Sequence, residues 1–410
     1  MSKKTLAMQK DGNPPGIKTI LLISPNFYEP TAWMMSAYKS ALALTTYQHL
    51  KVVVLTSQTK GSKAYERIQG VEVYRSKGWY LADPFNYTFT PFIFRDLGKL
   101  IKKYQPDAFL ISKYMFFTSL TGFYLRLKGY SYVLQTDTFP GYIWFSRSTL
   151  LNVLMWVYTR TLGLLLLRMA KKVVLLHRGL LAPAKELGLA ATVIPNGVDL
   201  QAFAKAKPAS DLLALAGKDK DSDSSTTSFT KSSSRRRFLV TYVGRLDAVK
   251  GYDILLRAAQ ILHEQKLPVQ FVFVCGDKYP EKRKALAQAY PFIRFFGFRS
   301  DIPSVFKASD IHVLASTAEG LPNSVLEAMA CHCVVIATPV GALPYHFKNK
   351  KDILFVKQDP HAFAKAIAYF VEHPEMLTTY QQNAYATITT FFDWAHLSSS
   401  LAAVLGESRA

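Results

Sequence analysis

Short apolar runs recur along this 410-residue chain, and the segments between them are long enough for one helix each. KTILLISP (18–25) and LKVVVLTS (50–57) enclose such a segment, and similar runs lie at 107–112, 132–136 and 172–177. A strand that is apolar at consecutive positions is buried on both faces, which is typical of parallel sheets covered by helices. The pattern therefore predicts an α/β fold with a doubly wound parallel sheet.

The alternation stops at one polar segment and then resumes. Residues 206–237 are rich in Ser, Thr and charge, which is typical of a linker that cannot bury enough apolar surface to order itself. Apolar runs begin again at 238–244. We therefore expect two doubly wound, Rossmann-like domains that face each other across a cleft at their strand ends. The predicted parts are a flexible tail (1–16), an N-terminal acceptor-binding domain (17–205), the linker (206–237), a C-terminal domain (238–386) and a terminal helical segment (387–410).

The positive charge of the chain is concentrated in its first half. Of the net charge of +21, residues 1–205 contribute +16, from 26 Lys and Arg against 10 Asp and Glu, which leaves +5 for the remainder. A surface this basic can meet nucleic acid, an anionic bilayer or an acidic substrate. Charge alone does not choose among these partners.

The three cysteines, Cys275, Cys331 and Cys333, have no spacing that suggests a disulfide framework, which fits a reducing cytoplasm. Cys331, His332 and Cys333 are adjacent in the sequence and cannot all turn toward one tetrahedral ion. We therefore expect no metal site.

The most apolar segment, residues 149–169, is about as long as a membrane span but contains Arg160 near its middle. A charge in the hydrocarbon core of a bilayer is costly. The segment therefore favours a buried or surface-lying helix over a membrane span.

Two glutamates mark the most informative stretch, STAEGLPNSVLEAMACHCVV (316–335). An apolar strand pattern at 310–316 runs into a polar turn, and Pro322 marks the start of a helix. Glu319 is then expected on the loop at the carboxyl end of a strand, and Glu327 within the helix. Free N–H groups at a helix start favour phosphate and other anionic oxygens, so the stretch suggests sugar hydroxyls held beside a phosphate. Alternatively, the two acids simply compensate the helix dipole.

Several ordered motifs resemble one known family. VGRLDAVKGYDILLRAA (243–259) and EGLPNSVLEAMACHCVVIATPVGALPYHF (319–347) resemble the family-four retaining glycosyltransferases of the GT-B fold, whose signature is two glutamates separated by seven residues. VIPNGVDLQAF (193–203) resembles the segment that closes the first domain of that family. FFDWAHLSSSLAAVL (391–405) resembles its final helix, which usually crosses back to the first domain.

The resemblance implies a donor site in the second domain. Glu319 would contact the donor sugar and Glu327 the ribose of the nucleotide. Arg245 and Lys250, between a strand and a helix, would neutralise a diphosphate leaving group without a metal. The other expected donor contacts are Gly244, then Phe298 and Arg299 on the loop that typically borders the base, and Gly320, Leu321, Pro322, Asn323 and Ser324.

The first domain departs from the family pattern at two places. Members often have a glycine pair after the first strand, whereas this chain has YEPTAW at 28–33. Many also place a histidine near the reacting sugar, where this chain has Thr136 and Asp137. Asp137 would either take a catalytic role at the cleft or cap the following turn. His177, at the end of another strand, is either a second polar site residue or a structural strand-end histidine.

The expected function is therefore that of a retaining, metal-independent glycosyltransferase with a nucleoside diphosphate sugar as donor. Residues 78–104 and 113–128 mix aromatic with basic side chains, so we expect a lipid-linked or membrane-borne glycan acceptor and a cytoplasmic location at the inner face of the cell membrane. Nucleic acid is not expected as a partner. Two alternatives stay open, namely a nucleotide-sugar epimerase or hydrolase of the same fold and a nucleic-acid-binding protein on a transferase-like fold.

Overall fold

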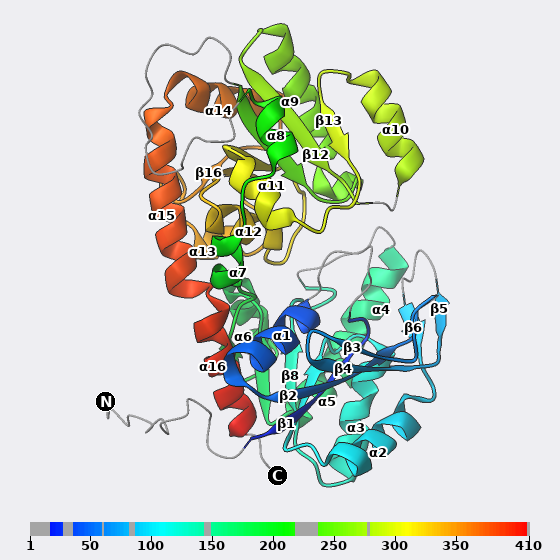
Figure 1. Ribbon diagram of the computed structural model, residues 1–410. Coiled ribbons are helices and arrows are strands. Elements are labelled where there is room, and N and C mark those ends of the chain that lie inside the picture. The colour runs from blue at the N-terminus through cyan, green and yellow to red at the C-terminus, as the bar shows by residue number, and fades with distance from the viewer. Residues whose placement is uncertain are drawn as a thin grey trace, which may run out of the picture. The chain divides into compact units, whose positions relative to one another are not determined.

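A computed structural model describes residues 17–27, 36–59, 61–81, 87–142, 149–217, 237–276 and 279–407 (Figure 1). The chain divides into two compact units. The first holds most of the chain up to Asn196 together with the segment that begins at Trp394. The second runs from Gly197 to Asp393.

An eight-stranded sheet in the order β10-β9-β8-β7-β1-β2-β4-β3 forms the centre of the first unit. Neighbouring strands are parallel except for the β3–β4 pair. The chain winds outward from β1 in both directions, as in a doubly wound sheet. The strands are β1 (Thr19–Ser24), β2 (Lys51–Ser57), β3 (Tyr65–Ile68), β4 (Val71–Ser76), β7 (Ala108–Ser112), β8 (Val133–Thr136), β9 (Lys172–Leu175) and β10 (Ala191–Val193), and a separate hairpin pairs β5 (Trp79–Leu81) with β6 (Tyr87–Phe89).

Helices cover both faces of this sheet. On one face, α1 (Ser36–Gln48) and α16 (Trp394–Gly406) share an apolar cluster with the strands, and a buried hydrogen bond of 3.0 Å joins Gln48 to Ser398. On the other face, a second cluster holds α2 (Ile93–Tyr104), α3 (Thr121–Leu127), α5 (Leu162–Met169) and α6 (Leu181–Glu186). The 3₁₀ turns η1 (Phe117–Leu120) and η2 (Arg178–Leu180) precede α3 and α6, and α4 (Thr149–Arg160) precedes α5.

The second unit is built on a fully parallel sheet in the order β13-β12-β11-β14-β15-β16. Its strands are β11 (Phe238–Val243), β12 (Val269–Val274), β13 (Arg294–Phe296), β14 (Ile311–Leu314), β15 (Val334–Ala337) and β16 (Leu354–Phe355). On one face lie α9 (Tyr252–Glu264) and α14 (Pro360–Glu372), on the other α8 (Ser210–Leu215), α11 (Ile302–Ala308) and α12 (Asn323–Ala330), and α15 (Glu375–Phe391) contributes to both cores. The remaining elements are α7 (Leu200–Lys205), η3 (Ala248–Lys250), α10 (Pro280–Ala289) and α13 (Leu343–His346).

Two predicted boundaries differ from the structure. The chain passes between the units after Asn196 and after Asp393, rather than near residues 205 and 386. The predicted linker is wrong for residues 206–217, because α8 lies there and its Leu212 is fully buried in the core of the second unit. The spacing of Ala209, Leu212 and Ala216 gives this short helix an apolar side that the polar composition of the longer segment concealed. The rest of the predicted linker up to residue 236 and the predicted tail at 1–16 lie outside the described residues.

The apolar segment Thr149–Met169 forms two consecutive helices at the surface. Within the described residues it is the one helical segment long and apolar enough to cross a membrane, and most of it is not buried in the unit. The helical path breaks at Thr161, and Leu166 and Leu167 of α5 are buried in the unit. The structure therefore shows a surface-lying helix α4 that is continued by a half-buried helix α5.

Candidate active site

The predicted donor stretch lies where the sheet of the second unit changes its winding direction. β11 and β14 are neighbours, but the strands after β11 extend to one side and those after β14 to the other. Loops at such a switch point diverge and leave room for a ligand at the carboxyl ends of the strands. Residues 315–322 connect β14 to α12 here, and residues 244–251 connect β11 to α9. The two groups of predicted donor-site residues therefore come from adjacent strand ends.

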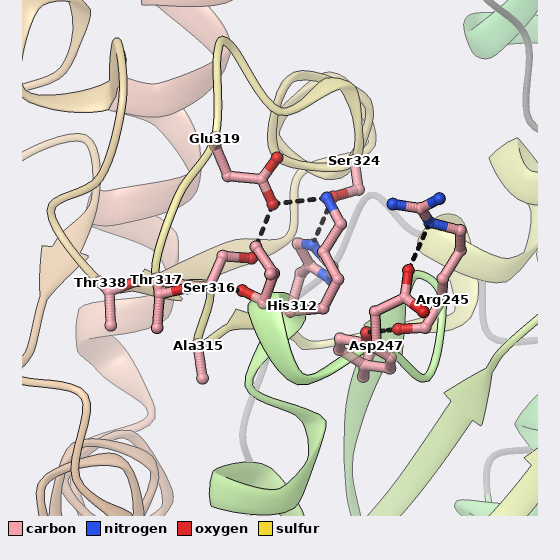
Figure 2. Close-up of polar contacts among 12 residues, drawn as sticks. Arg245, Asp247, His312, Ala315, Ser316, Thr317, Glu319, Ser324 and Thr338 are labelled. Atoms are coloured by element: carbon pink, nitrogen blue, oxygen red, sulfur yellow. Dashed lines mark hydrogen bonds and ion pairs between the residues drawn. The ribbon is translucent and has the colours of Figure 1, made fainter. Parts of the chain in front are cut away.

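The carboxylate of Glu319 joins these two loops. Its Oε1 accepts hydrogen bonds from Lys250 Nζ at 2.6 Å and from the Ser316 hydroxyl at 2.6 Å (Figure 2). The side chains of Glu319 and Lys250 are only 10% and 23% exposed, so their attraction is less screened than that of a surface pair. The ammonium group has three donors, which leaves Lys250 able to bind an anion while it holds Glu319.

The backbone of the Glu319 loop is fixed by hydrogen bonds to its surroundings. The amide of Thr317 donates to the carbonyl of Val249 at 2.8 Å, which ties the loop directly to η3. Further bonds of 2.6 to 2.8 Å run from Thr338 Oγ1 to the Ser316 carbonyl, from Gln358 Nε2 to the Ala315 carbonyl and from the Ala342 amide to the Gly320 carbonyl. A loop with this many fixed carbonyls holds its free N–H groups in one arrangement, which is the condition for electrostatic preorganisation.

Two glycines allow other backbone segments to approach this loop closely. Gly251 has φ +61° and Gly341 has φ +57°, a conformation that favours glycine. A Cβ atom at Gly251 would lie 2.0 Å from the Ala315 carbonyl oxygen, and one at Gly341 would lie 2.3 Å from the carbonyl oxygens of Glu319 and Gly320. Both glycines therefore help to shape the Glu319 loop, and neither was among the predicted site residues.

Arg245 lies at the end of β11, directly after Gly244. Its Nε contacts Asp247 Oδ2 at 3.0 Å, and about half of its side chain is exposed. The buried Tyr242 hydroxyl donates to the Arg245 carbonyl at 2.6 Å, and burial raises the pKa of Tyr242 so that the donor proton stays in place. The loop backbone is also bound by Lys282, whose Nζ donates to the Leu246 carbonyl at 2.9 Å. The guanidinium thus projects from a supported backbone.

Helix α12 begins directly after the Glu319 loop, with Leu321 and Pro322 buried before it and Asn323 as its first residue. Asn323 Oδ1 is buried and has no hydrogen-bond partner among the described residues. Glu327 lies on the second turn of α12 and is half-buried. The structure therefore brings the predicted glutamates to one loop and the helix that follows it.

His312 lies behind the Glu319 loop and is bonded to Ser324 of α12, and it was not among the predicted site residues. It is fully buried on β14, where Nδ1 lies 3.0 Å from the Thr241 carbonyl and Nε2 lies 3.3 Å from the Ser324 hydroxyl. Burial lowers the pKa of His312 to about 4, so the ring is neutral at neutral pH. Nδ1–H then donates to the carbonyl, and Nε2 accepts from Ser324. A histidine inside the otherwise apolar strand DIHVLAS is the signal that would have identified this residue.

Arg299 forms ion pairs with two carboxylates within the fold. Its guanidinium contacts Asp301 at 2.6 Å and Asp211 at 2.5 Å, so it joins the start of α11 to α8. The hydrogen bonds from Arg299 hold the pKa of Asp301 below its usual value. The half-buried Phe298 precedes it in the loop. The predicted contacts of these two residues with a base stay predictions.

In the first unit, Asp137 and His177 meet at the carboxyl ends of β8 and β9. His177 Nε2 donates to the Asp137 carbonyl at 3.1 Å, and Asp137 Oδ2 contacts Lys113 Nζ at 3.2 Å. Burial lowers the pKa of His177, whose Nδ1 has no partner among the described residues. The predicted catalytic role of Asp137 stays a prediction. The segment at 28–33, where the family's glycine pair is replaced, lies outside the described residues.

Within the described part of the chain, no three His, Cys, Asp or Glu side chains gather in a way that would hold a metal ion. Cys275, Cys331 and Cys333 are buried thiols, and burial raises the pKa of Cys275 and of Cys331 to about 12. Cys275 and Cys331 are therefore protonated in the fold.

Two family models match successive parts of the chain. They are Glycosyltransferase Family 4 over residues 38–202 and Glycosyl transferases group 1 over residues 224–387. The UDP-Gal:alpha-D-GlcNAc-diphosphoundecaprenol alpha-1,3-galactosyltransferase of Escherichia coli is 32% identical over 185 residues, which are 43% of this chain and 44% of that protein. A D-inositol 3-phosphate glycosyltransferase of Corynebacterium glutamicum is 28% identical over 182 residues, 42% of this chain and 43% of its own. The chain thus spans less than half the length of these relatives.

Solved structures match over nearly the whole chain. Sucrose-phosphate synthase from Thermosynechococcus elongatus has a TM-score of 0.70 at 21% identity, covering 94% of this chain and 98% of its own. HepE from Anabaena, solved in complex with UDP-glucose, has a TM-score of 0.69 at 16% identity, covering 95% and 99%. Likeness at this level of identity concerns the fold, and it confirms the predicted α/β class with two Rossmann-like domains.

Proposed function

Since the chain belongs to the family-four glycosyltransferases of the GT-B fold, we propose that it transfers a sugar from a nucleoside diphosphate sugar to an acceptor hydroxyl with retention at the anomeric carbon. The observation that carries the proposal is the contact between Lys250 and Glu319 at the switch point of the second sheet. This contact places a cation and a carboxylate beside the start of a helix. In this proposal the cation binds the diphosphate of the donor and the carboxylate binds a hydroxyl of its sugar.

The leaving diphosphate is stabilised by Lys250 and Arg245 in this proposal. Lys250 has spare donors beyond the one that binds Glu319, and the half-exposed guanidinium of Arg245 can adopt a bidentate contact with phosphate oxygens. Backbone N–H groups of the fixed loop at 320–323 add neutral donors next to the positive end of α12. Together these groups neutralise the developing charge, so the proposed mechanism uses no metal.

Glu319 positions the sugar in this proposal. Both of its hydrogen bonds fall on Oε1, and Oε2 receives none from the described residues, so Oε2 can accept a hydroxyl of the donor sugar. Glu327 would bind the ribose. The departing phosphate takes the proton of the attacking hydroxyl on the same face of the sugar, so no strong protein base is needed.

We propose a UDP-sugar as donor and a lipid-linked glycan as acceptor, bound at the inner face of the membrane. A uridine diphosphate donor is supported by the name of the Escherichia coli relative and by the UDP-glucose complex of HepE. The name of the Escherichia coli relative also supports an acceptor on a lipid diphosphate. The net charge of +16 in residues 1–205 suits such an anionic acceptor.

A thermal-shift screen of UDP, GDP and ADP tests the donor. UDP at a hundred times its Kd should stabilise the protein by about 2.7 kcal/mol, and Lys250→Ala should weaken this binding about tenfold or more, because a charged hydrogen bond is lost. Lys284→Ala, which removes an exposed lysine from α10, is the matched control. The proposal fails if none of the three nucleotides binds.

A transfer assay then separates transfer from hydrolysis. UDP-sugars are incubated with a polyprenyl-diphosphate N-acetylglucosamine and, in parallel, without any acceptor. We expect sugar transfer that depends on the acceptor. Equal consumption of donor in both reactions would identify a nucleotide-sugar hydrolase, and interconversion of the donor sugar without acceptor would identify an epimerase.

A further inference from the structure

Helix α4 of the first unit has its apolar side turned outward. Leu150, Val153, Leu154 and Val157 recur at the spacing of one helix face, and they are 70%, 53%, 55% and 43% exposed. In a helix that packs on a core, the apolar face is the buried one. The amphipathic pattern of α4 is therefore inverted relative to that of an ordinary surface helix.

The inward side of α4 is held by polar contacts, so the outward apolar side is a fixed feature. The buried Thr159 hydroxyl donates to the Pro140 carbonyl at 2.8 Å and lies 3.1 Å from the Tyr114 hydroxyl. The Tyr158 hydroxyl donates to the Tyr114 carbonyl at 2.7 Å. Rotating α4 to bury its leucines would break these three hydrogen bonds.

The same layer of helices continues the apolar surface and adds positive charge to it. Leu162 and Leu165 of α5 are exposed, and so is Leu127 of α3. Helix α2 packs against α3, α3 against α5, and α5 against α4, so these four helices are successive neighbours in one layer, and their solvent side is here called the α2–α5 face. The exposed cations Arg95, Lys99 and Lys102 of α2 line a hollow of about 330 Å³ between α2 and α3.

Acidic residues are nearly absent from these helices. The sequences of α3, α4 and α5 contain no Asp or Glu, and α2 contains only Asp96, which is bonded to Ser76 and Arg95. At the end of α4, Arg160 stacks on Trp156 with 4.6 Å between the guanidinium and the ring centroid, and pairs with Glu186. An aromatic ring next to a cation suits the boundary between headgroups and acyl chains.

We propose that the α2–α5 face rests on an anionic lipid bilayer, with the outward side of α4 inserted among the headgroups and the α2 cations on lipid phosphates. A small soluble ligand would leave the exposed apolar side chains of α4 in water. Nucleic acid would engage the cations alone. A second copy of this chain would bring two basic surfaces together, which repel. A bilayer with anionic lipid satisfies both the apolar stripe and the charge.

The inference deepens the proposed function, because a lipid-linked acceptor lies in a bilayer, but it can be tested without donor or acceptor. The full chain is floated with vesicles of phosphatidylglycerol and phosphatidylethanolamine, and in parallel with vesicles of phosphatidylcholine. We expect binding to the anionic vesicles that is at least tenfold tighter than to the neutral ones and that weakens when salt is raised. Absence of binding to both kinds of vesicle overturns the proposal.

A double variant of α4 tests whether vesicle binding occurs through this face. Leu150→Glu with Leu154→Glu places charge on the inserted stripe and should weaken vesicle binding at least tenfold. Its control is Phe391→Glu, which replaces a 53% exposed apolar residue of the second unit and should bind as wild type. Wild-type vesicle binding by the α4 variant overturns the proposal, as does equal loss in the control.

The charge is tested with Lys99→Glu and Lys102→Glu together. Each basic residue near an anionic leaflet contributes about fivefold, so this pair should lose at least tenfold. Lys284→Glu with Lys365→Glu, two exposed lysines of the second unit, is the control that should change binding little. Equal losses in both pairs would show that only net charge matters and would overturn the assignment to α2.

Two further measurements separate this inference from its competitors. Light scattering measures whether the wild type is a dimer and whether Leu150→Glu/Leu154→Glu dissociates it. Such a result would mean that α4 contacts a second copy of this chain, and it would overturn the bilayer proposal. With a water-soluble acceptor, the α4 variant should keep the wild-type transfer rate. If neither the wild type nor any variant transfers sugar but vesicle binding follows the expected pattern, the proposed function fails and the bilayer contact stands.

Discussion

Gly341→Ala tests whether close backbone contact holds the Glu319 loop in place. The new methyl group would lie 2.3 Å from the carbonyl oxygens of both Glu319 and Gly320, whereas ordinary contact begins at 3.4 Å. These oxygens belong to backbone and cannot rotate away, so the loop must move by about 1 Å. Displacement of that size at a reacting group reduces rates by about a hundredfold.

The variant also has a conformational cost that must be separated from the displacement. Alanine at φ +57° costs about 1 to 2 kcal/mol of folding free energy. Gly129→Ala is the matched control, because Gly129 has φ +83° and no atom within 4 Å of its added methyl group. Gly129→Ala should lose a similar amount of folding free energy, because its alanine also adopts the left-handed conformation, and it should leave the transfer rate unchanged.

The assay compares UDP affinity by calorimetry, the transfer rate, and the free energy of unfolding for the two variants. Gly341→Ala should lower the transfer rate about a hundredfold and weaken UDP binding, while both variants keep the wild-type circular dichroism spectrum. A rate within threefold of wild type in folded Gly341→Ala would refute the idea that this contact fixes Glu319.

Three other outcomes follow from the site. Glu319→Ala should reduce turnover at least about a hundredfold while UDP still binds; a near-normal rate in this variant contradicts its positioning role. Arg245→Ala and Lys250→Ala should each raise the Kd for UDP, and a chelator should leave the rate unchanged; strict dependence on a divalent ion would point to a metal-assisted mechanism. Since the pKa of His312 falls from 6.5 to about 4 on folding, its neutral form contributes stability that is present above pH 6.5 and is lost as the pH falls toward 4. A shift of that size corresponds to about 3 kcal/mol. His312→Gln should therefore reduce the loss of unfolding free energy between pH 6.5 and pH 4, measured by urea unfolding. The same loss in the variant as in the wild type would contradict the shifted pKa of His312.

Local pattern was sufficient for the strands β1, β2, β7, β8, β9, β11 and β14 and for the loops that carry Glu319 and Lys250, but not for the edge strand β3. The apolar runs at 310–316 and 238–244 form β14 and β11, and Glu319 and Lys250 lie on the loops that follow them. Their pairing could be expected because parallel strands end at the same edge of a sheet. The spacing of Glu319 and Glu327 also placed them correctly on a loop and on the helix after it.

Other features depend on contacts between distant segments and could not be predicted. His312 contacts Thr241 only because β14 lies beside β11 in this register. Gly341 touches Glu319 because the loop after β15 folds back onto the loop after β14. The face of a helix that meets solvent is also a tertiary property. For α4, the apolar stripe was visible in the sequence, but its outward direction follows from the inward hydrogen bonds of Thr159.

The hydrogen bonds of Glu319 bear on the order of events in the proposed reaction. A carboxylate whose Oε1 accepts from both an ammonium and a hydroxyl is stabilised as an anion, and this lowers its tendency to attack an anomeric carbon. If Glu319 formed a covalent bond to the sugar, Lys250 would lose the anion it holds at the moment when the diphosphate leaves. If Glu319 stays ionised, Lys250 can bind Glu319 and the diphosphate together through separate N–H donors. The geometry of this pair therefore supports the proposed role of Glu319 as an anion that positions the sugar, rather than as the nucleophile.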